Sequence, residues 1–206
     1  MKPYSEIAQI LSQKDPILAK VIQSVKTEIK PSPDIDVYCA LLESIVSQQL
    51  SVKVADIIWK RFTDLFDNQY PNARQILLTE DAVLRSIGLS GQKTKYMNNV
   101  ANFSLENDMS FEYLNALTDE EIIDYLTPIV GIGKWTVQMI LMFPMDRPNV
   151  FPIDDLGIQT KMKAWYDIDL EKKELKAKLT SIAENWDPYK SLASKYLWKS
   201  TLSDGR

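Results

Sequence analysis

The segment 126–157 constrains the fold most, because it requires two chain reversals that each lead directly into a helix. Upstream, the residues T-D-E-E at 118–121 are typical of a capping box that opens a helix, and a later proline ends that helix. Gly131 and Gly133 then allow a tight turn, since glycine adopts backbone conformations that other residues avoid. The pattern predicts a helical hairpin over residues 119–143.

The start of the second hairpin helix is a candidate anion site. Its first backbone N–H groups have no partner within the helix, and they carry the positive end of the helix dipole. Phosphate is the obvious anion for such a position. An ordinary αα-hairpin with glycines at its turn explains the same residues without any ligand. The turn alone leaves both interpretations open.

Two adjacent acids follow the second reversal, which Pro152 introduces. Asp154 is predicted to be the N-cap of a helix over about 155–166, because an aspartate there accepts backbone N–H groups. Asp155 would then lie in the first turn, where the helix dipole stabilises a carboxylate. Capping alone can explain both acids. One cap needs only one of them, however, so Asp155 is predicted to be available for chemistry.

Four blocks of the sequence occur in the order typical of one known family. They are I-V-S-Q-Q-L-S (45–51), G-I-G-K-W-T (131–136), F-P-I-D-D-L-G (151–157) and N-W-D-P-Y-K-S (185–191). Over about residues 37–202 the chain resembles the helix-hairpin-helix DNA glycosylase superfamily, in its alkylpurine branch of the 3-methyladenine DNA glycosylase II type. The resemblance implies an all-α fold of two helical lobes with a cleft between them.

The resemblance also implies a catalytic residue and a base pocket. Asp155 matches the essential aspartate of the superfamily, and Trp135 and Tyr189 match aromatic residues that line the pocket. Two further pocket positions, which are tyrosines in the branch, are Met139 and Leu156 here, so the substrate range is open. Aromatic residues at helical spacing usually belong to a core. Trp135 opens a helix beside a turn, which favours the pocket.

Contacts with DNA are implied for three turns. The residues expected to make them are Gly131, Gly133, Lys134, Thr136, Gln49, Leu50, Gly91 and Lys93. The family pushes one side chain of the turn at 47–51 into the duplex, and either Gln49 or Leu50 could act as this wedge. A polar connection between two helices explains the same turn without DNA.

A structural Na⁺ or K⁺ ion is a further implication of the resemblance. In the family, backbone carbonyls of the hairpin hold the ion, and by position these would be the carbonyls of Thr127, Ile129 and Gly131. No other cofactor is expected.

Composition excludes several kinds of chemistry. The 206 residues include no histidine and one cysteine, so a Ser-His-Asp triad, a Cys-based zinc site and an internal disulfide are ruled out. Acid–base work therefore falls to Asp, Glu, Lys or Tyr. The net charge of −4 argues weakly against nucleic acid, although the distribution of charge matters more than its sum.

We predict one glycosylase unit over residues 1–206, with one lobe over about 35–148 and the other over about 1–34 plus 149–206. The clearest linker is 28–36, which contains two prolines. No apolar run reaches the length of a membrane span. A monomer is expected, located in the cytoplasm of a bacterium or in the nucleus of a eukaryote.

The predicted activity is hydrolytic excision of alkylated purines, such as 3-methyladenine and 7-methylguanine, from double-stranded DNA. In members of the superfamily that also cut the strand, a lysine nucleophile follows the hairpin glycines. Trp135 occupies that position, which predicts a glycosylase without lyase activity. Two alternatives are a glycosylase for oxidised or mismatched bases and a hairpin module that only binds DNA.

Overall fold

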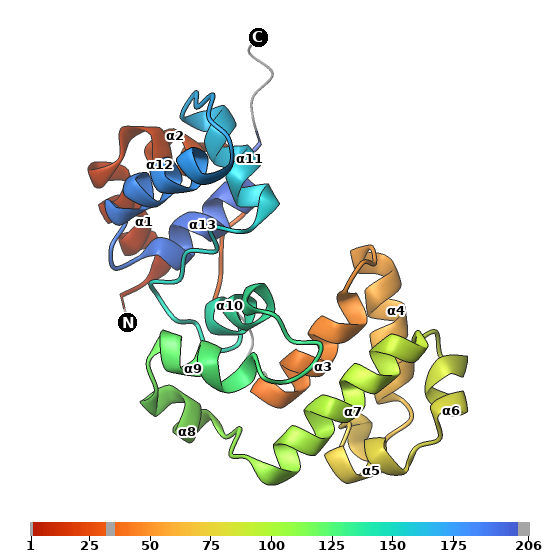
Figure 1. Cartoon of the computed structure of the whole chain (residues 1–206). Coiled ribbons are helices and arrows are strands. Elements are labelled where there is room, and N and C mark those ends of the chain that lie inside the picture. The colour runs from red at the N-terminus through yellow and green to blue at the C-terminus, as the bar shows by residue number, and fades with distance from the viewer. Residues whose placement is uncertain (1, 32–35, 202–206) are drawn as a thin grey trace. The chain divides into compact units, whose positions relative to one another are not determined.

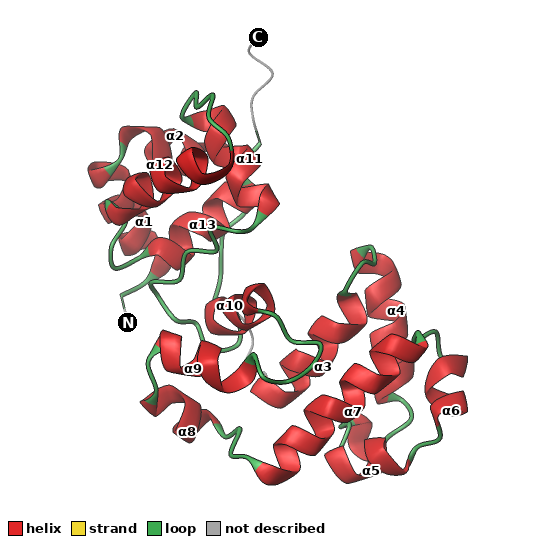
Figure 2. Ribbon diagram, viewed as in Figure 1, coloured by secondary structure: helices red, strands yellow, loops and turns green. Residues whose placement is uncertain are grey.

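The computed structural model describes residues 2–31 and 36–201, and within these ranges every regular element is a helix (Figures 1 and 2). The predicted all-α class is confirmed. No helix of the described part is long and apolar enough to cross a lipid bilayer. The predicted lobe boundary at Ile35 and the linker proline Pro33 lie outside the described residues.

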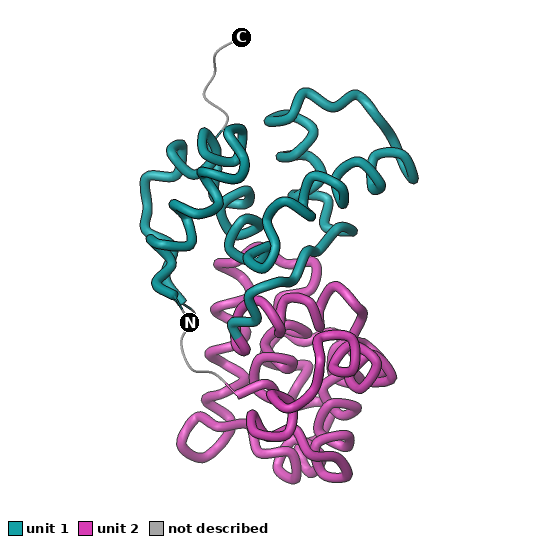
Figure 3. Tube along the Cα trace, turned by 90° about the vertical axis from the view of Figure 1, so that its left-hand side faces the viewer, with its two compact units in different colours: residues 1–32, 146–206 teal, residues 33–145 magenta. Residues whose placement is uncertain are grey.

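The chain forms two compact units, which are coloured separately in Figure 3. Unit 1 combines residues 1–32 with 146–206, and unit 2 is continuous over residues 33–145. The lobes expected from the sequence had their second boundary at about residue 148, and the boundary between the two units lies after residue 145.

Unit 2 contains eight α-helices and a short 3-10 helix among its described residues. They are α3 (Val37–Ser47), α4 (Val52–Thr63), η1 (Asp67–Gln69), α5 (Ala73–Leu78), α6 (Asp81–Ser86), α7 (Gly91–Glu106), α8 (Phe111–Ala116), α9 (Asp119–Leu126) and α10 (Lys134–Met142).

Helix α7 organises unit 2, since it packs against α3, α5 and α6 (Figure 1). Its inward face carries Met97, Val100 and Ala101, all completely buried, and Ser90 caps its start by accepting the Lys93 N–H. The hairpin helices α9 and α10 pack on each other, and α10 also packs on α3. The hairpin is therefore attached to the same helices that support the other predicted DNA-contacting turns.

Unit 1 is built from helices at both ends of the chain. They are α1 (Tyr4–Lys14), α2 (Pro16–Ser24), α11 (Leu156–Trp165), α12 (Lys172–Glu184) and α13 (Lys190–Lys199). Leu11 and Leu18 from the first two helices share a core with Ile158, Leu179 and Leu197 from the last three. Because the two sets of helices are far apart in sequence, this core joins the chain ends into one unit.

A buried carboxylate also joins the two ends of unit 1. Asp15 is 7% exposed and caps α2 by accepting the N–H groups of Ile17 and Leu18 at 2.9 and 3.0 Å on Oδ1. Its Oδ2 accepts the Tyr166 hydroxyl at 2.6 Å and the Trp186 indole N–H at 2.9 Å. The cap lies within the Asp-Pro pair that opens α2, whereas the two other donors come from distant parts of the chain.

Candidate nucleic-acid and catalytic site

The predicted hairpin is present in unit 2. The capping box at the start of α9 is confirmed, with the Thr118 hydroxyl and the Glu121 carboxylate each accepting the other's backbone N–H. Gly131 has φ +108°, and Gly133 is the N-cap of α10. The first backbone bond of α10 runs from the Val137 N–H to the Gly133 carbonyl at 3.1 Å. The N–H groups of Lys134, Trp135 and Thr136 precede this bond and belong to the first turn of the helix, where an anion can bind.

Side chains from α7 and from the turn after α3 hold the hairpin turn in place. Gln48 Nε2 donates to the Gly131 carbonyl at 3.1 Å, and Asn99 Nδ2 donates to the Val130 carbonyl at 3.0 Å. The ring of Tyr96 lies directly against Gly131, where an added Cβ would be only 2.4 Å from it. The side chain of Val130 is 65% exposed. These contacts hold the backbone of the turn, and the side chain of Val130 faces solvent.

The three turns predicted to contact DNA are linked to each other. Gln48, from the turn after α3, reaches the hairpin turn as described above. Lys93, from the first turn of α7, donates to the carbonyls of Val46 and Gln48 at 2.7 Å each. Burial lowers the pKa of Lys93 below its usual value. Lys93 therefore supports the end of α3, and its contact with phosphate stays a prediction.

The turn at 47–51 has one residue in the left-handed region of backbone conformation. Gln49 has φ +59° and an exposed side chain, and Leu50 beside it is 37% exposed. Both wedge candidates therefore reach solvent. The left-handed backbone places Gln49 at the apex of the turn, but the identity of the wedge stays a prediction.

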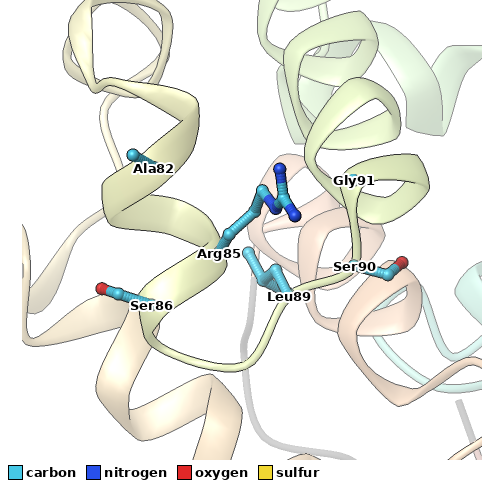
Figure 4. Close-up of a pocket in the computed structure, with 6 residues that line it drawn as sticks. All are labelled: Ala82, Arg85, Ser86, Leu89, Ser90 and Gly91. Carbon is cyan, nitrogen blue, oxygen red and sulfur yellow. The ribbon is translucent and has the colours of Figure 1, made fainter.

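An open hollow of about 700 Å³ lies where α6 leads into α7 (Figure 4). Arg85 projects from α6 toward the start of α7, near Ser90 and Gly91. Gly91 was predicted to lie at this turn and Arg85 was not, although a basic residue in the last turn of a helix before a glycine turn is typical of such a position. Arg85 adds a positive charge to this candidate phosphate-contacting turn.

The two hairpin glycines should respond differently to alanine. Gly131→Ala should destabilise unit 2 by about 1–3 kcal/mol, because Cβ meets the Tyr96 ring and φ is positive.

Gly133 has no atom within 4 Å of an added Cβ, so Gly133→Ala should fold normally. It should nevertheless weaken binding to an abasic duplex roughly fivefold, the loss of about one hydrogen bond. Thermal melting and fluorescence anisotropy measure the two effects. If Gly133→Ala binds the abasic duplex with unchanged affinity, the phosphate does not bind at the start of α10.

The residues after the glycines have different exposures. Trp135 is 46% exposed, Lys134 is exposed, and Met139, one helical turn beyond Trp135, is half-buried. Thr136 is only 5% exposed, so the prediction that it contacts DNA is wrong for its side chain. The physical reason is that the Thr136 side chain lies on the buried face of α10. Only its backbone N–H, in the first turn of the helix, is placed for a contact with phosphate.

The acid turn in unit 1 corrects one prediction. Asp155, not Asp154, is the N-cap of α11, and its Oδ1 accepts the Ile158 N–H at 2.8 Å. Asp154 is half-exposed and forms an ion pair with Lys176 of α12. The helix starts one residue later than predicted, at Leu156. The Asp154 carboxylate is therefore not part of the cap.

Asp155 has a second hydrogen-bond donor that the sequence did not reveal. The indole Nε1 of Trp198, in the last turn of α13, donates to Asp155 Oδ1 at 2.9 Å. Leu156, next to Asp155, is 76% exposed, as a residue that contacts a ligand must be. Tyr189 is the N-cap of α13 and is partly buried against the unit 1 core, and its place in a base pocket stays a prediction.

Two of the carbonyls predicted to hold a Na⁺ or K⁺ ion also accept hydrogen bonds within the chain. The Gly131 carbonyl accepts Gln48 Nε2, and the Ile129 carbonyl accepts the Ile132 N–H at 2.9 Å. A carbonyl oxygen has a second lone pair, so these bonds leave a cation site at Thr127, Ile129 and Gly131 a prediction. No step below uses a cation.

Known proteins match most of the chain. The family described as HhH-GPD superfamily base excision DNA repair protein matches residues 42–185. A Bacillus subtilis relative with a provisional DNA-3-methyladenine glycosylase name is 35% identical over 173 residues, which are 81% of this chain and 60% of that protein. The chain thus spans less than two thirds of that relative. DNA-3-methyladenine glycosylase 1 of Schizosaccharomyces pombe is 34% identical over 170 residues, which are 81% of this chain and 74% of that protein.

A solved structure gives the same result. The Schizosaccharomyces pombe 3-methyladenine DNA glycosylase in complex with abasic DNA superposes with a TM-score of 0.79 at 28% identity, covering 94% of this chain and 95% of that one. The match extends over both units, and the hairpin and acid turn lie inside the family region. The chain therefore belongs to the HhH-GPD superfamily of base excision DNA repair proteins.

Proposed function

We propose that this protein is a monofunctional DNA glycosylase that excises alkylated purines, of the 3-methyladenine and 7-methylguanine type, from duplex DNA and leaves an abasic site. One observation carries the proposal: three turns predicted separately to contact DNA are joined by the hydrogen bonds of Gln48 and Lys93. The names of the relatives and the abasic DNA in the Schizosaccharomyces pombe structure support the same substrate class.

Backbone groups supply much of the DNA contact in this proposal. The first-turn N–H groups of α10 bind a phosphate, and the missing Cβ of Gly133 lets the backbone approach it. Lys134, Arg85 and the start of α7 add contacts of the same kind. Contacts with phosphate position the protein without reading sequence, as a damage-searching enzyme needs. The negative net charge makes this binding weak and sensitive to salt.

The damaged nucleotide is extruded from the duplex, which costs a few kcal/mol and costs least for a weakly paired base. Gln49 or Leu50 fills the space that the base leaves. The exposed Trp135 of unit 2 stacks on the electron-poor purine. Tyr189, Met139 and Leu156 are the other pocket positions that the family resemblance implies, and the last two leave the range of excised bases open.

Hydrolysis follows from the charge of the substrate. An N3- or N7-alkylated purine is cationic, so the electrons of the N-glycosidic bond neutralise it as it leaves, and little acid catalysis is needed. The sugar becomes positively charged, as in glycoside hydrolysis. The Asp155 carboxylate stabilises that charge or orients the water that bonds to C1′ and loses a proton. A site without histidine is sufficient for this reaction.

Incubation of the protein with methylated duplex DNA, followed by identification of the released bases, tests the proposal. Release of 3-methyladenine and 7-methylguanine is expected. Release of only oxidised or deaminated bases from parallel substrates would assign a different specificity. If the protein binds modified duplexes but releases no base from any of them, it is a module that only binds DNA.

The enzyme should leave the abasic strand intact. A lyase needs a lysine amine that forms a Schiff base with the opened sugar. Trp135 has no amine, and Lys134 lies about 100° away around the helix, on the phosphate side. Borohydride should therefore trap no covalent adduct, and strand breaks should appear only after alkali. An adduct, or cleavage before alkali, would show that a lysine acts at this site.

A further inference from the structure

We propose that Trp198 is a positioning residue for the Asp155 carboxylate, and this inference rests on the proposed catalytic role of Asp155. Its indole N–H donates to Oδ1 of Asp155 at 2.9 Å, across 43 positions of sequence. The same oxygen accepts the Ile158 N–H at 2.8 Å. Trp198 therefore supplies a contact beyond the one that any N-cap aspartate receives from its own helix.

The two donors approach Oδ1 from different elements. The Ile158 N–H belongs to α11 and fixes the distance of the oxygen from the helix end. The Trp198 indole belongs to α13 and takes a second acceptor position of the same oxygen. A carboxylate held by one donor can still rotate about that bond. Two donors from different directions restrict the rotation, so the carboxylate keeps one orientation before the substrate arrives.

Gly157 provides the space for this arrangement. A Cβ at Gly157 would lie 3.0 Å from Asp155 Oδ1 and 3.4 Å from Trp198 Cδ1. Glycine in a helical turn is less favourable than alanine, so its presence calls for a packing reason. The close approach of the indole to the carboxylate supplies that reason.

The last turn of α13 is anchored independently of Asp155. Trp165 Nε1 donates to Ser200 Oγ at 3.1 Å, and Lys161 Nζ donates to the Ser200 carbonyl at 2.6 Å. Leu197 is completely buried in the unit 1 core. These contacts hold the end of α13 against α11, so the position of the Trp198 ring does not depend on its bond to the carboxylate.

Trp198→Phe removes the N–H donor and keeps an aromatic ring. Single-turnover excision of 7-methylguanine should slow roughly 10- to 100-fold, the effect of a misplaced reacting group. Affinity for an abasic duplex should not change. The matched control is Trp165→Phe, which removes another partly buried indole N–H bond between α11 and the end of α13 without touching Asp155. In this variant the bond from Lys161 to the Ser200 carbonyl and the buried Leu197 still hold the end of α13, so its excision rate should stay at the wild-type value. An equal loss in both variants would overturn the inference.

A double-mutant cycle separates positioning from a general structural role. If Trp198 acts through the carboxylate, Trp198→Phe should have no further effect on the slow residual excision by Asp155→Asn. An equal fold-loss in both backgrounds overturns the inference. A fully active Trp198→Phe beside an inactive Asp155→Asn also overturns it and leaves the proposed function standing. A fully active Asp155→Asn instead refutes the proposed role of Asp155 itself.

Gly157→Ala is a second route to the same result. It keeps the indole and adds a methyl group 3.0 Å from Oδ1 and 3.4 Å from the indole Cδ1, so one of the two must shift. The excision rate should fall while the affinity for abasic DNA is kept, even if Trp198→Phe folds poorly. Wild-type excision by a folded Gly157→Ala would contradict the positioning role.

Discussion

Asp155→Asn is expected to lower the single-turnover rate of base release by roughly 100-fold or more, because it removes the negative charge that stabilises the developing cation. The substitution should remove the charge without disturbing the local structure. The amide oxygen of asparagine can still accept the Ile158 N–H and the Trp198 indole N–H, and asparagine is as good an N-cap as aspartate. Folding and affinity for abasic DNA should therefore be unchanged, as measured by circular dichroism and fluorescence anisotropy.

The matched control is Asp154→Asn. Asp154 is half-exposed and its ion pair with Lys176 lies at the surface, where such pairs contribute about 1 kcal/mol at most. Excision should stay at the wild-type rate. An inactive Asp154→Asn beside an active Asp155→Asn would transfer the chemistry to the neighbouring acid.

Asp15→Ala is expected to lower the free energy of unfolding by about 3 kcal/mol, the largest effect on stability that we predict. The substitution removes the N-cap of α2, which contributes about 1 kcal/mol. It also leaves the Tyr166 hydroxyl and the Trp186 indole N–H without their acceptor in a buried site, and each unsatisfied donor is costly.

Urea denaturation followed by circular dichroism measures the effect, and Asp15→Asn separates its two causes. Asparagine keeps an oxygen for the cap, but its NH2 group must face two donors at the other position. We expect Asp15→Asn to remain clearly less stable than the wild type. Wild-type stability of Asp15→Asn would show that only the cap matters.

Signals confined to a few neighbouring residues were predicted correctly from the sequence. The capping box at 118–121 and the glycine turn that leads into α10 both appear in the structure. Each depends on residues within three positions of one another. Such contacts form wherever the local chain is helical, so the order of residues is sufficient to identify them.

Assignments that depended on distant contacts were wrong or absent. Asp154 was expected to cap α11, but Lys176 engages it and Asp155 takes the cap. Thr136 was expected at the DNA surface and is buried. The support of the hairpin turn by Gln48 and Tyr96 was not predicted at all. No local pattern carries these contacts, since each joins residues that meet only when helices pack.

The sequence by itself therefore determined the helical class, the glycine turn before α10, the pair of acids before α11 and the family to which these blocks belong. Only the tertiary structure decided which acid caps the helix, which side chains hold the turns, and that Trp198 reaches Asp155. The physical reason is range: helix signals act within one turn of the chain, whereas the orientation of a reactive carboxylate is set by packing between helices that are distant in sequence.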